Sequence, residues 1–573
     1  MALSRARSTP HLAQKTPVLK PPLLPLALWI VIQAAHGQPL PSAGSQLQQI
    51  PQVPAPQEAN PTIRIESALP DAAPSPDSMR IKVLRLAVTG ARAYTESELL
   101  AVTGFQPGSE LSLADLQAMA MKITGHYRGQ GYFVAQAYLP PQEIRDGAVV
   151  ITVIEGRLGK IDVRNRSSLS DAHIQRQLEG LHPGDTVQID PIENRLLLLS
   201  DIPGVKVAST LTPGAAVGES DLIVDVAPGE RVTGSIDADN AGNRYTGEYR
   251  LGATVNLNNP AGLGDVASLR ALTSGSGLSY ARASYQVPWR RATVGVAYSW
   301  LEYELGREFA FAQASGTAQV ASLYGSYALI RSRQTRLSAG LSLDAKSFRD
   351  RRPLNPDMPV EDKRAQVLTA SLRGDHRDAV GGGGITGFSL AWSTGHVDLR
   401  TPGLALIDAP VQSAGGFQKL AFSASRLQSV TPRVSLFAGV NGQLASKNLD
   451  VSEKMALGGM YGVRAYPEGE AYGDQGYLAT FEARRQLPHT ERLPGQWQLV
   501  GFVDTGSVTL YKHPWSSTST NQRSLHGAGV GLQWAHHDNV SIRAYYARKL
   551  GHEAATSAPD KSGRFWIQAV KYF

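Results

Sequence analysis

Arg464 is the one cation in a long glycine-rich stretch that runs from Leu457 to Gly476. Glycine permits backbone angles that other residues avoid, so a segment of this composition without an apolar period is predicted to be a loop. Ordered loops of this length usually have a function. A planar guanidinium can bind a carboxylate through two parallel hydrogen bonds. The chemistry expected here is therefore ionic docking.

The best carboxylate partner for Arg464 is Asp504, in the segment GFVDTG over 501–506. Side chains alternate along a strand, so Phe502 and Asp504 would share the inward face and the residue between them would face lipid. Glu482, in YLATFEARRQ, is the competing partner. An unpaired charge in a partly dehydrated site is costly. The alternative is that Arg464 is simply one more cation in a barrel lumen.

The elements that must position these residues are strands. Helical patterns end near Arg231, and short segments of alternating polarity take over. Sixteen such segments are predicted, an even number, as single-chain bacterial membrane barrels require. They lie near 231–240, 243–256, 265–273, 279–287, 292–302, 318–330, 334–349, 363–376, 384–395, 415–428, 433–445, 476–487, 496–507, 525–536, 538–548 and 563–573.

The connections between these segments alternate in length. They are short and polar after even-numbered strands, at 288–291, 331–333 and 429–432, and long after later odd-numbered ones, at 350–362, 396–414, 446–475, 508–524 and 549–562. Membrane barrels have short periplasmic turns and long outer loops. Arg464 is then in the sixth external loop, 446–475. A sixteen-stranded barrel has a lumen wide enough for such a loop to enter.

The N-terminus is predicted to be an export signal. Basic residues precede the apolar run Leu23–Ile32, and Ala35-His36-Gly37 forms a small-x-small cleavage pattern. We assign 1–37 as a signal peptide. Residues 38–78 are rich in Pro, Ala, Ser and Gln and are predicted to be a linker, in which Ser42–Ile50 forms either a short helix or disordered chain.

Two modules of about 75 residues precede the strand-rich region. Each has the order strand, helix, helix, strand, strand, which indicates an internal repeat over 79–156 and 157–229. Thr95 with Glu98 has the spacing of a capping box, Ser112 opens a second helix, and Ser170 caps a helix in the second module. The modules resemble polypeptide-transport-associated (POTRA) domains. An open sheet edge in such a module can accept an extended peptide as an added strand.

Composition excludes several function classes. The chain has 573 residues, 18% charged, a formal net charge of +7 and no cysteine. The absence of cysteine suits export into an oxidising periplasm. Its basic residues form no groove for nucleic acid. No P-loop, zinc-ligand spacing or nucleophile elbow is present, so we predict no cofactor, no metal and no enzymatic activity.

Two motifs resemble those of a known family. Val463-Arg464-Ala465-Tyr466 is similar to the VRG[YF] loop motif, and Phe502–Gly506 to the F-x-D-x-G strand motif, of the outer-membrane translocators of two-partner secretion (the TpsB, or haemolysin secretion/activation, family). The resemblance covers essentially the whole mature chain. It implies α+β POTRA modules followed by an all-β transmembrane barrel of sixteen antiparallel strands over 230–573. Ala465 replaces the family's glycine, and since alanine tolerates positive φ poorly, a tighter or shifted loop tip is expected.

The resemblance also implies roles. Arg464 and Asp504 would meet inside the barrel and hold the loop, with Val463, Tyr466, Phe502, Gly506 and Glu482 in support. The segment Ser42–Ile50 would plug the lumen. The POTRA pair would bind, in the periplasm, a secreted exoprotein with an N-terminal secretion domain, which would cross unfolded without nucleotide hydrolysis. Outer-membrane lipid and, during biogenesis, the barrel assembly machinery would be further partners.

Two other functions remain open at this point. One is a barrel assembly or insertion factor of the same superfamily, which the presence of only two POTRA modules disfavours. The other is a solute porin, which the loop motif disfavours. All three place the barrel in the bacterial outer membrane and the modules in the periplasm.

Overall fold

The computed structural model describes residues 41–51, 62–65, 79–488, 494–515, 520–536 and 539–573. The predicted signal peptide, 1–37, lies outside the described residues, as does most of the predicted linker. No helix among the described residues is long and apolar enough to cross a membrane.

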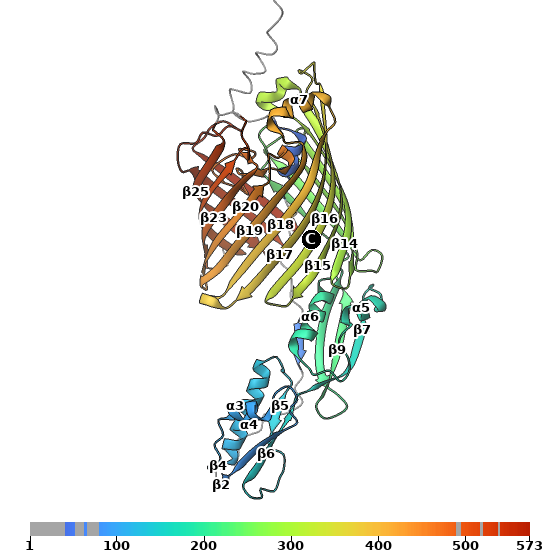
Figure 1. Cartoon of the computed structure of the whole chain (residues 1–573), viewed down its shortest axis with the longest axis vertical. Coiled ribbons are helices and arrows are strands. Elements are labelled where there is room, and N and C mark those ends of the chain that lie inside the picture. The colour runs from blue at the N-terminus through green and yellow to red at the C-terminus, as the bar shows by residue number, and fades with distance from the viewer. Residues whose placement is uncertain (1–40, 52–61, 66–78, 489–493, 516–519, 537–538) are drawn as a thin grey trace, which may run out of the picture. The chain divides into compact units, whose positions relative to one another are not determined.

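A closed antiparallel barrel of sixteen strands forms the larger part of the chain (Figure 1). Each strand pairs with the next, and β10 closes the ring by pairing with β27. The prediction of sixteen strands is confirmed. The strands are β10 (Val232–Asp239), β11 (Arg250–Asn258), β12 (Val266–Thr273), β13 (Leu278–Trp289), β14 (Ala292–Glu304), β15 (Ser315–Arg331), β16 (Thr335–Arg351), β17 (Val360–Asp378), β18 (Gly384–Leu399), β19 (Gly415–Thr431), β20 (Val434–Ala445), β23 (Gln475–Gln486), β24 (Gln496–Thr509), β25 (Gln522–His536), β26 (Val540–Lys549) and β27 (Gly563–Tyr572).

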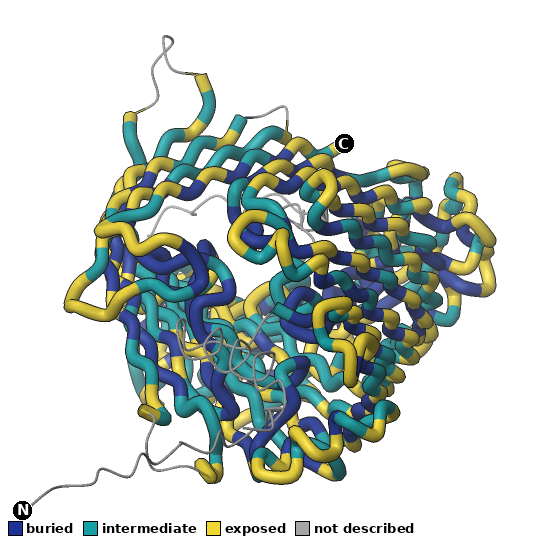
Figure 2. Tube along the Cα trace, turned by 90° about the horizontal axis from the view of Figure 1, so that it is seen from above, coloured by how far each residue is buried: buried dark blue, intermediate teal, exposed yellow. Residues whose placement is uncertain are grey.

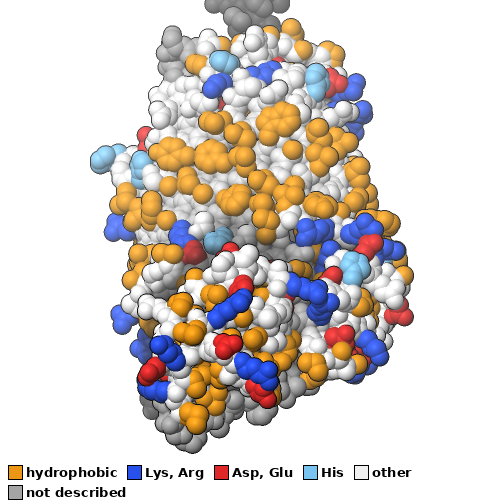
Figure 3. All heavy atoms as spheres, turned by 60° about the horizontal axis from the view of Figure 1, so that its bottom comes forward, with side chains coloured by type: hydrophobic (Ala, Val, Ile, Leu, Met, Phe, Trp, Pro, Cys, Tyr) orange, Lys and Arg blue, Asp and Glu red, His pale blue; other side chains and the backbone are white. Residues whose placement is uncertain are grey.

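Residues along the barrel strands alternate between two environments (Figure 2). On β24, Val500, Phe502 and Asp504 are buried, while Gly501 and Val503 are exposed. On the face of the barrel that Figure 3 shows, hydrophobic side chains form a belt with charged groups at both borders. An apolar outer face is the pattern of a strand barrel in lipid, since lipid offers no partner to polar groups.

The alternation of connection length follows the prediction. Turns 290–291, 332–334 and 432–433 are short, whereas 352–359, 400–414 and 446–474 are long. Several long connections contain elements that the sequence did not predict: η1 (Arg307–Ala312), helix α7 (Pro402–Val411), and, within 446–474, η3 (Val451–Glu453), β21 (Met455–Ala456) and β22 (Tyr472–Gly473). A further short element, η2 (Val380–Gly382), lies in the turn between β17 and β18.

The first module has a three-stranded sheet in the order β3-β6-β5 and a separate β2-β4 pair. The predicted first strand is broken into β2 and β3, and β4 was not predicted. Thr95 and Ser112 cap their helices through complete capping boxes. The elements are β2 (Arg80–Val83), β3 (Arg85–Thr89), α3 (Glu96–Thr103), β4 (Ser109–Ser112), α4 (Leu113–Gly129), β5 (Gln136–Tyr138) and β6 (Ala148–Ile154).

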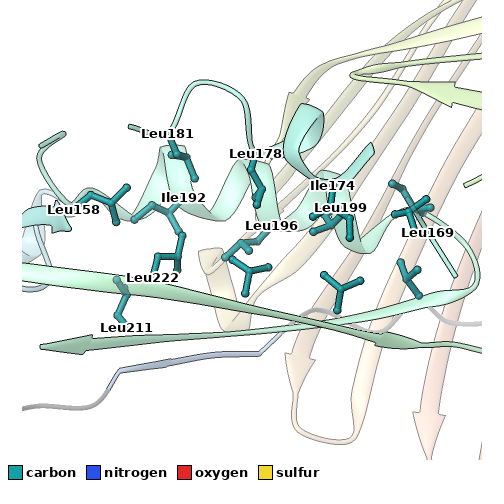
Figure 4. Packing of buried hydrophobic residues seen from close by; sticks show 14 of the residues in the cluster. Leu158, Leu169, Ile174, Leu178, Leu181, Ile192, Leu196, Leu199, Leu211 and Leu222 are labelled. Atoms are coloured by element: carbon teal, nitrogen blue, oxygen red, sulfur yellow. The ribbon is translucent and has the colours of Figure 1, made fainter. Parts of the chain in front are cut away.

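The second module packs two helices on one sheet. Ile174 of α5 and Leu196 and Leu199 of α6 face Leu211 and Leu222 of the sheet (Figure 4). Ser170 stands at the N-cap of α5 but makes no side-chain capping bond, unlike Ser112. The elements are β7 (Arg157–Asn165), α5 (Asp171–Leu178), α6 (Ile189–Ser200), β8 (Val205–Pro213) and β9 (Glu219–Pro228).

One strand lies where only linker was expected. Residues 62–65 form β1 (Thr62–Ile65), which pairs in parallel with β8 and extends the second module's sheet to the order β1-β8-β9-β7. The linker prediction is therefore wrong for these four residues. A Pro-rich composition carries no information about a remote sheet edge that supplies backbone partners.

Candidate functional site

The loop over 446–474 folds into a compact body whose tip is buried. Its two arms meet in the β21–β22 pair. Between the arms, Val463 N donates to Leu457 O at 2.8 Å and Tyr466 N donates to Val463 O at 3.0 Å, which makes a tight turn. Val463, Ala465 and Tyr466 are fully buried in one apolar cluster with residues of β24 to β27. The loop tip thus packs on the inner face of four barrel strands.

Arg464 is bound by Asp504 through three hydrogen bonds. Its Nε donates to Oδ2 at 2.8 Å, its Nη2 donates to Oδ1 at 2.8 Å, and its backbone N donates to Oδ2 at 3.1 Å. Both side chains are inaccessible to solvent, Asp504 completely and Arg464 to within 5%. Burial lowers the pKa of Arg464, but the bonds and charges of Asp504 and Glu482 outweigh it and hold that pKa above its usual value. The two-point geometry fixes the direction of the guanidinium as well as its position.

Glu482 also binds Arg464 rather than competing for it, so the expectation of rival partners is wrong. Arg464 Nη1 donates to Glu482 Oε1 at 2.9 Å. The other Glu482 oxygen accepts from Arg484 Nε at 2.8 Å. On the neighbouring strands, Glu482 lies opposite Phe502 and Thr480 opposite Asp504, so both carboxylates project from the same inner face.

Aromatic side chains complete the enclosure of Arg464. The guanidinium carbon lies 3.4 Å from the ring centroid of Phe502 and 5.0 Å from that of Tyr545. Trp566 Nε1 donates to the carbonyl of Arg464 at 2.7 Å. The spacing to Asp504 predicts the inward position of Phe502, but the sequence does not predict its contact with Arg464 or the contacts of Tyr545 and Trp566. They come from β26 and β27, and only closure of the barrel brings these strands beside the loop.

The remaining motif residues support the loop tip. Tyr466 is fully buried, and its hydroxyl donates to the carbonyl of Glu553 in the last external loop at 3.1 Å. A Cβ on Gly506 would collide with Leu457 Cδ1 and with the carbonyl of Tyr477, so the loop approaches β24 closely there. Val463 lies in the apolar cluster.

Ala465 does not strain the loop tip. Seven non-glycine residues among those described have a positive φ, and Ala465 is not one of them. The expectation of a tighter or shifted tip is therefore wrong. It assumed that residue 465 needs a left-handed backbone conformation with positive φ, and Ala465 does not have one. Its methyl group is fully buried.

The N-terminal arm of the loop is held by a second set of charges. Glu453 accepts from Lys346 Nζ at 2.6 Å and from Lys419 Nζ at 2.8 Å, and Asp450 accepts from Lys363 Nζ at 2.8 Å. The three lysines belong to β16, β17 and β19. The sequence does not predict this set, because a single lysine on a strand belongs to no motif.

Residues 43–48 form the short helix α2 (Ala43–Gln48). Of the two alternatives for Ser42–Ile50, a short helix or disordered chain, the helix is correct. Ala43 N donates to Asp350 Oδ1 of β16 at 2.8 Å, and Gln48 Nε2 donates to the carbonyl of Val451 in the loop arm at 2.8 Å. Thr246 Oγ1 donates to Gln46 Oε1 at 2.8 Å. The helix therefore contacts both the barrel strands and the loop.

The arrangement binds one arginine and fixes its position. No group of three or more His, Asp or Glu side chains in the described part of the chain is placed to hold a metal ion. Its chemistry is that of a charged, aromatic-lined clamp on one arginine.

Comparison with known proteins agrees with this architecture. The family model of the haemolysin secretion/activation protein ShlB/FhaC/HecB matches residues 218–534, and that of the ShlB-type POTRA domain matches 81–156. The heme/hemopexin transporter protein HuxB of Haemophilus influenzae is 32% identical over 478 residues, 81% of this chain and 82% of that protein.

More distant relatives include a transporter and a solved structure. The outer membrane transporter CdiB of Escherichia coli is 26% identical over 78% of this chain and 76% of its own. The solved structure of CdiB from Escherichia coli superposes with a TM-score of 0.67 at 21% identity, covering 88% of this chain and 93% of that one. That likeness shows a shared fold.

Proposed function

The chain belongs to the haemolysin secretion/activation protein family and is an outer-membrane transporter of two-partner secretion, and we propose that Arg464 locks its sixth external loop inside the barrel. The family is one of transporters, with the barrel in the outer membrane and the POTRA modules in the periplasm. The lock would fix the loop so that the lumen opens only when the exported partner is engaged.

The observation that carries the lock is the sharing of one buried arginine by two carboxylates from two strands. Arg464 bonds Asp504 of β24 and Glu482 of β23. Removing one member of a buried ion pair costs about 3–5 kcal/mol, because the remaining charge stays unpaired and poorly hydrated. A loop tip held in this way has one favoured position.

The experiment on the lock uses Arg464→Ala and Asp504→Ala. Both variants should insert normally and export far less partner protein per inserted barrel than the unaltered chain. Arg548→Ala is the matched control, because Arg548 is exposed on β26, on the side opposite the buried Tyr545 and Ala547. Full export by both lock variants at normal barrel levels would rule the lock out.

The partner would be a dedicated exoprotein whose N-terminal secretion domain binds the POTRA modules by adding a strand. In the described chain, β5 pairs only with β6, so one of its edges offers backbone groups to an extended peptide. The edge of β8, in contrast, is occupied by β1. Ala137 is buried and its N already donates to Thr124 Oγ1 of α4 at 2.9 Å, so the test uses Tyr138, which is 39% exposed at the end of β5. A photo-cross-linking residue at position 138 should capture the secretion domain of the partner.

The cargo class that the relatives favour is a haem-acquisition exoprotein, since the relative that is 32% identical is a heme/hemopexin transporter. An adhesin, a haemolysin and a contact-dependent toxin are the other classes. Identifying the large exoprotein encoded beside this gene and testing its haem binding would separate them. An exoprotein with a toxin domain would overturn the haem assignment.

Export would take place on unfolded cargo without nucleotide hydrolysis. The apolar belt of the barrel would contact outer-membrane lipid, and the barrel assembly machinery would insert the barrel.

Deleting the gene should abolish secretion of one protein and leave the other outer-membrane barrels unchanged. A general loss of barrels would favour an assembly factor instead.

A further inference from the structure

We propose that Gly527 on β25 and Ala465 at the loop tip form a matched pair, in which the missing side chain of one makes room for the methyl group of the other. The inference rests on the proposed lock and adds a positioning residue that neither sequence motif contains. Gly527 is buried on β25. It acts by setting how closely the loop approaches the barrel wall.

The space at Gly527 is filled by Ala465. A Cβ added at Gly527 would lie 2.5 Å from the Cβ of Ala465 and 3.4 Å from its backbone N. Two carbon atoms at 2.5 Å overlap far inside their normal contact of about 3.5–4.0 Å. Both residues are buried, so neither can turn outward to relieve the overlap.

Gly527 also lies beside the lock itself. In the pairing of β24 with β25, the residue opposite Gly527 is Asp504. The backbone N of Arg464, which immediately precedes Ala465, donates to Asp504 Oδ2 at 3.1 Å. A methyl group on residue 527 would push Ala465 away from the wall. That displacement lengthens the bonds between Arg464 and Asp504, and it does so without changing any charge.

Gly529, two residues further on the same face, makes room for a different group. A Cβ there would lie 2.5 Å from Cζ of Phe502 and would collide with the carbonyl of Tyr546. Neither of these atoms belongs to the loop. A substitution in the loop can therefore relieve an overlap at residue 527 but cannot relieve one at residue 529. This difference makes the pairing of 465 with 527 testable.

The test is a double-mutant cycle on the full-length protein in outer membranes. The variants are Gly527→Ala, Ala465→Gly and the two combined. Gly501→Ala is the control for adding a methyl group to a barrel strand, because a Cβ at Gly501 would have no atom within 4 Å. Gly529→Ala, alone and combined with Ala465→Gly, is the control for the location of the effect.

Two measurements are made for each variant at equal amounts of inserted barrel. One is export of the partner protein. The other is trypsin cleavage after Arg464, which requires the loop tip to leave its buried site and reports docking without any export.

Gly527→Ala should lower export and raise cleavage by about tenfold, the range that overpacking of a buried site produces. Ala465→Gly alone should stay close to the unaltered protein. The combined variant should recover normal export and protection from cleavage. Once the Cβ of residue 465 is gone, the nearest atoms to the added methyl are Arg548 O at 3.3 Å and the backbone N of residue 465 at 3.4 Å. Gly529→Ala should be impaired with or without the loop change.

The pairing is overturned if Gly527→Ala behaves like Gly501→Ala in the cleavage assay, or if the combined variant is as easily cleaved as Gly527→Ala. The cycle also separates this inference from the proposed lock. If cleavage follows the expected pattern while export is unchanged in these variants and in Arg464→Ala, the pair positions the loop but the lock does not control export.

Discussion

The guanidinium of Arg464 lies over the ring of Phe502, with its central carbon 3.4 Å from the ring centroid. The ring face is negative and attracts the cation, and in a dehydrated site such a contact is worth up to about 2 kcal/mol. The ring of Phe502 also packs against the backbone of β25 at Gly529, where a Cβ would lie 2.5 Å from its Cζ. The arginine is thus held by an aromatic surface as well as by carboxylates.

Phe502→Leu should weaken the lock without removing a charge. Losing about 2 kcal/mol of cation–π attraction in this dehydrated site corresponds to a roughly thirtyfold effect, which is smaller than the cost of removing a buried charge, so export per barrel should fall less than in Asp504→Ala. Export and trypsin cleavage after Arg464 measure the change. Phe481→Leu is the matched control, since Phe481 is exposed on β23. Equal export by Phe502→Leu and the control would contradict a role for the ring.

Glu453→Gln should release the N-terminal arm of the loop. The carboxylate lies between Lys346 and Lys419, and a neutral amide leaves both ammonium groups without a counter-charge, at a cost of about 3–5 kcal/mol. Helix α2 contacts this arm, so residues of the helix should become accessible to solvent when the arm is released. A cysteine at the buried Ser45 reports this by maleimide labelling, since the chain has no other cysteine.

The control for this labelling is a cysteine at Val217, which is 92% exposed and should react equally in both backgrounds. Protection of residue 45 that persists in Glu453→Gln would mean that the lysine contacts do not hold the arm.

Gly44→Ala should displace helix α2. A Cβ there would lie 2.9 Å from the Cβ of Ser452 in the loop arm, an overlap of the kind that costs about 1–3 kcal/mol. If the helix plugs the lumen, the variant should conduct more ions in planar bilayers. Ser452→Gly in the same chain should restore low conductance by removing the colliding atom. Unchanged conductance in Gly44→Ala would argue against plugging by this helix.

Ser112→Ala should destabilise the first POTRA module by about 1 kcal/mol. The Ser112 hydroxyl accepts from the backbone N of Asp115 at 3.2 Å, and the Asp115 carboxylate accepts from the backbone N of Ser112 at 2.9 Å. Hydrogen exchange of α4 in the intact protein should speed up by roughly fivefold. Ser170→Ala, at an N-cap without a side-chain bond, should change α5 much less. Similar effects at both serines would contradict the capping account.

Local patterns in the sequence were sufficient for the barrel and for the central pair of the site. Polar and apolar side chains alternate along every strand, and short and long connections alternate between successive strands. These two patterns gave the number of strands and the location of the loop without coordinates. Arg464 and Asp504 were identifiable because a lone cation in a glycine-rich loop needs a carboxylate partner. The alternation along its strand also placed the side chain of Asp504 on the inner face of the barrel.

Tertiary structure decided everything that depends on which remote strands become neighbours. Closure of β10 on β27 brings Trp566 to the carbonyl of Arg464, and the pairing of β24 with β25 sets Gly527 beside Asp504. Residues 62–65 form a strand only because β8 offers backbone groups there. Ala465 fits because the glycine opposite it leaves space, and no local pattern around residue 465 contains that information.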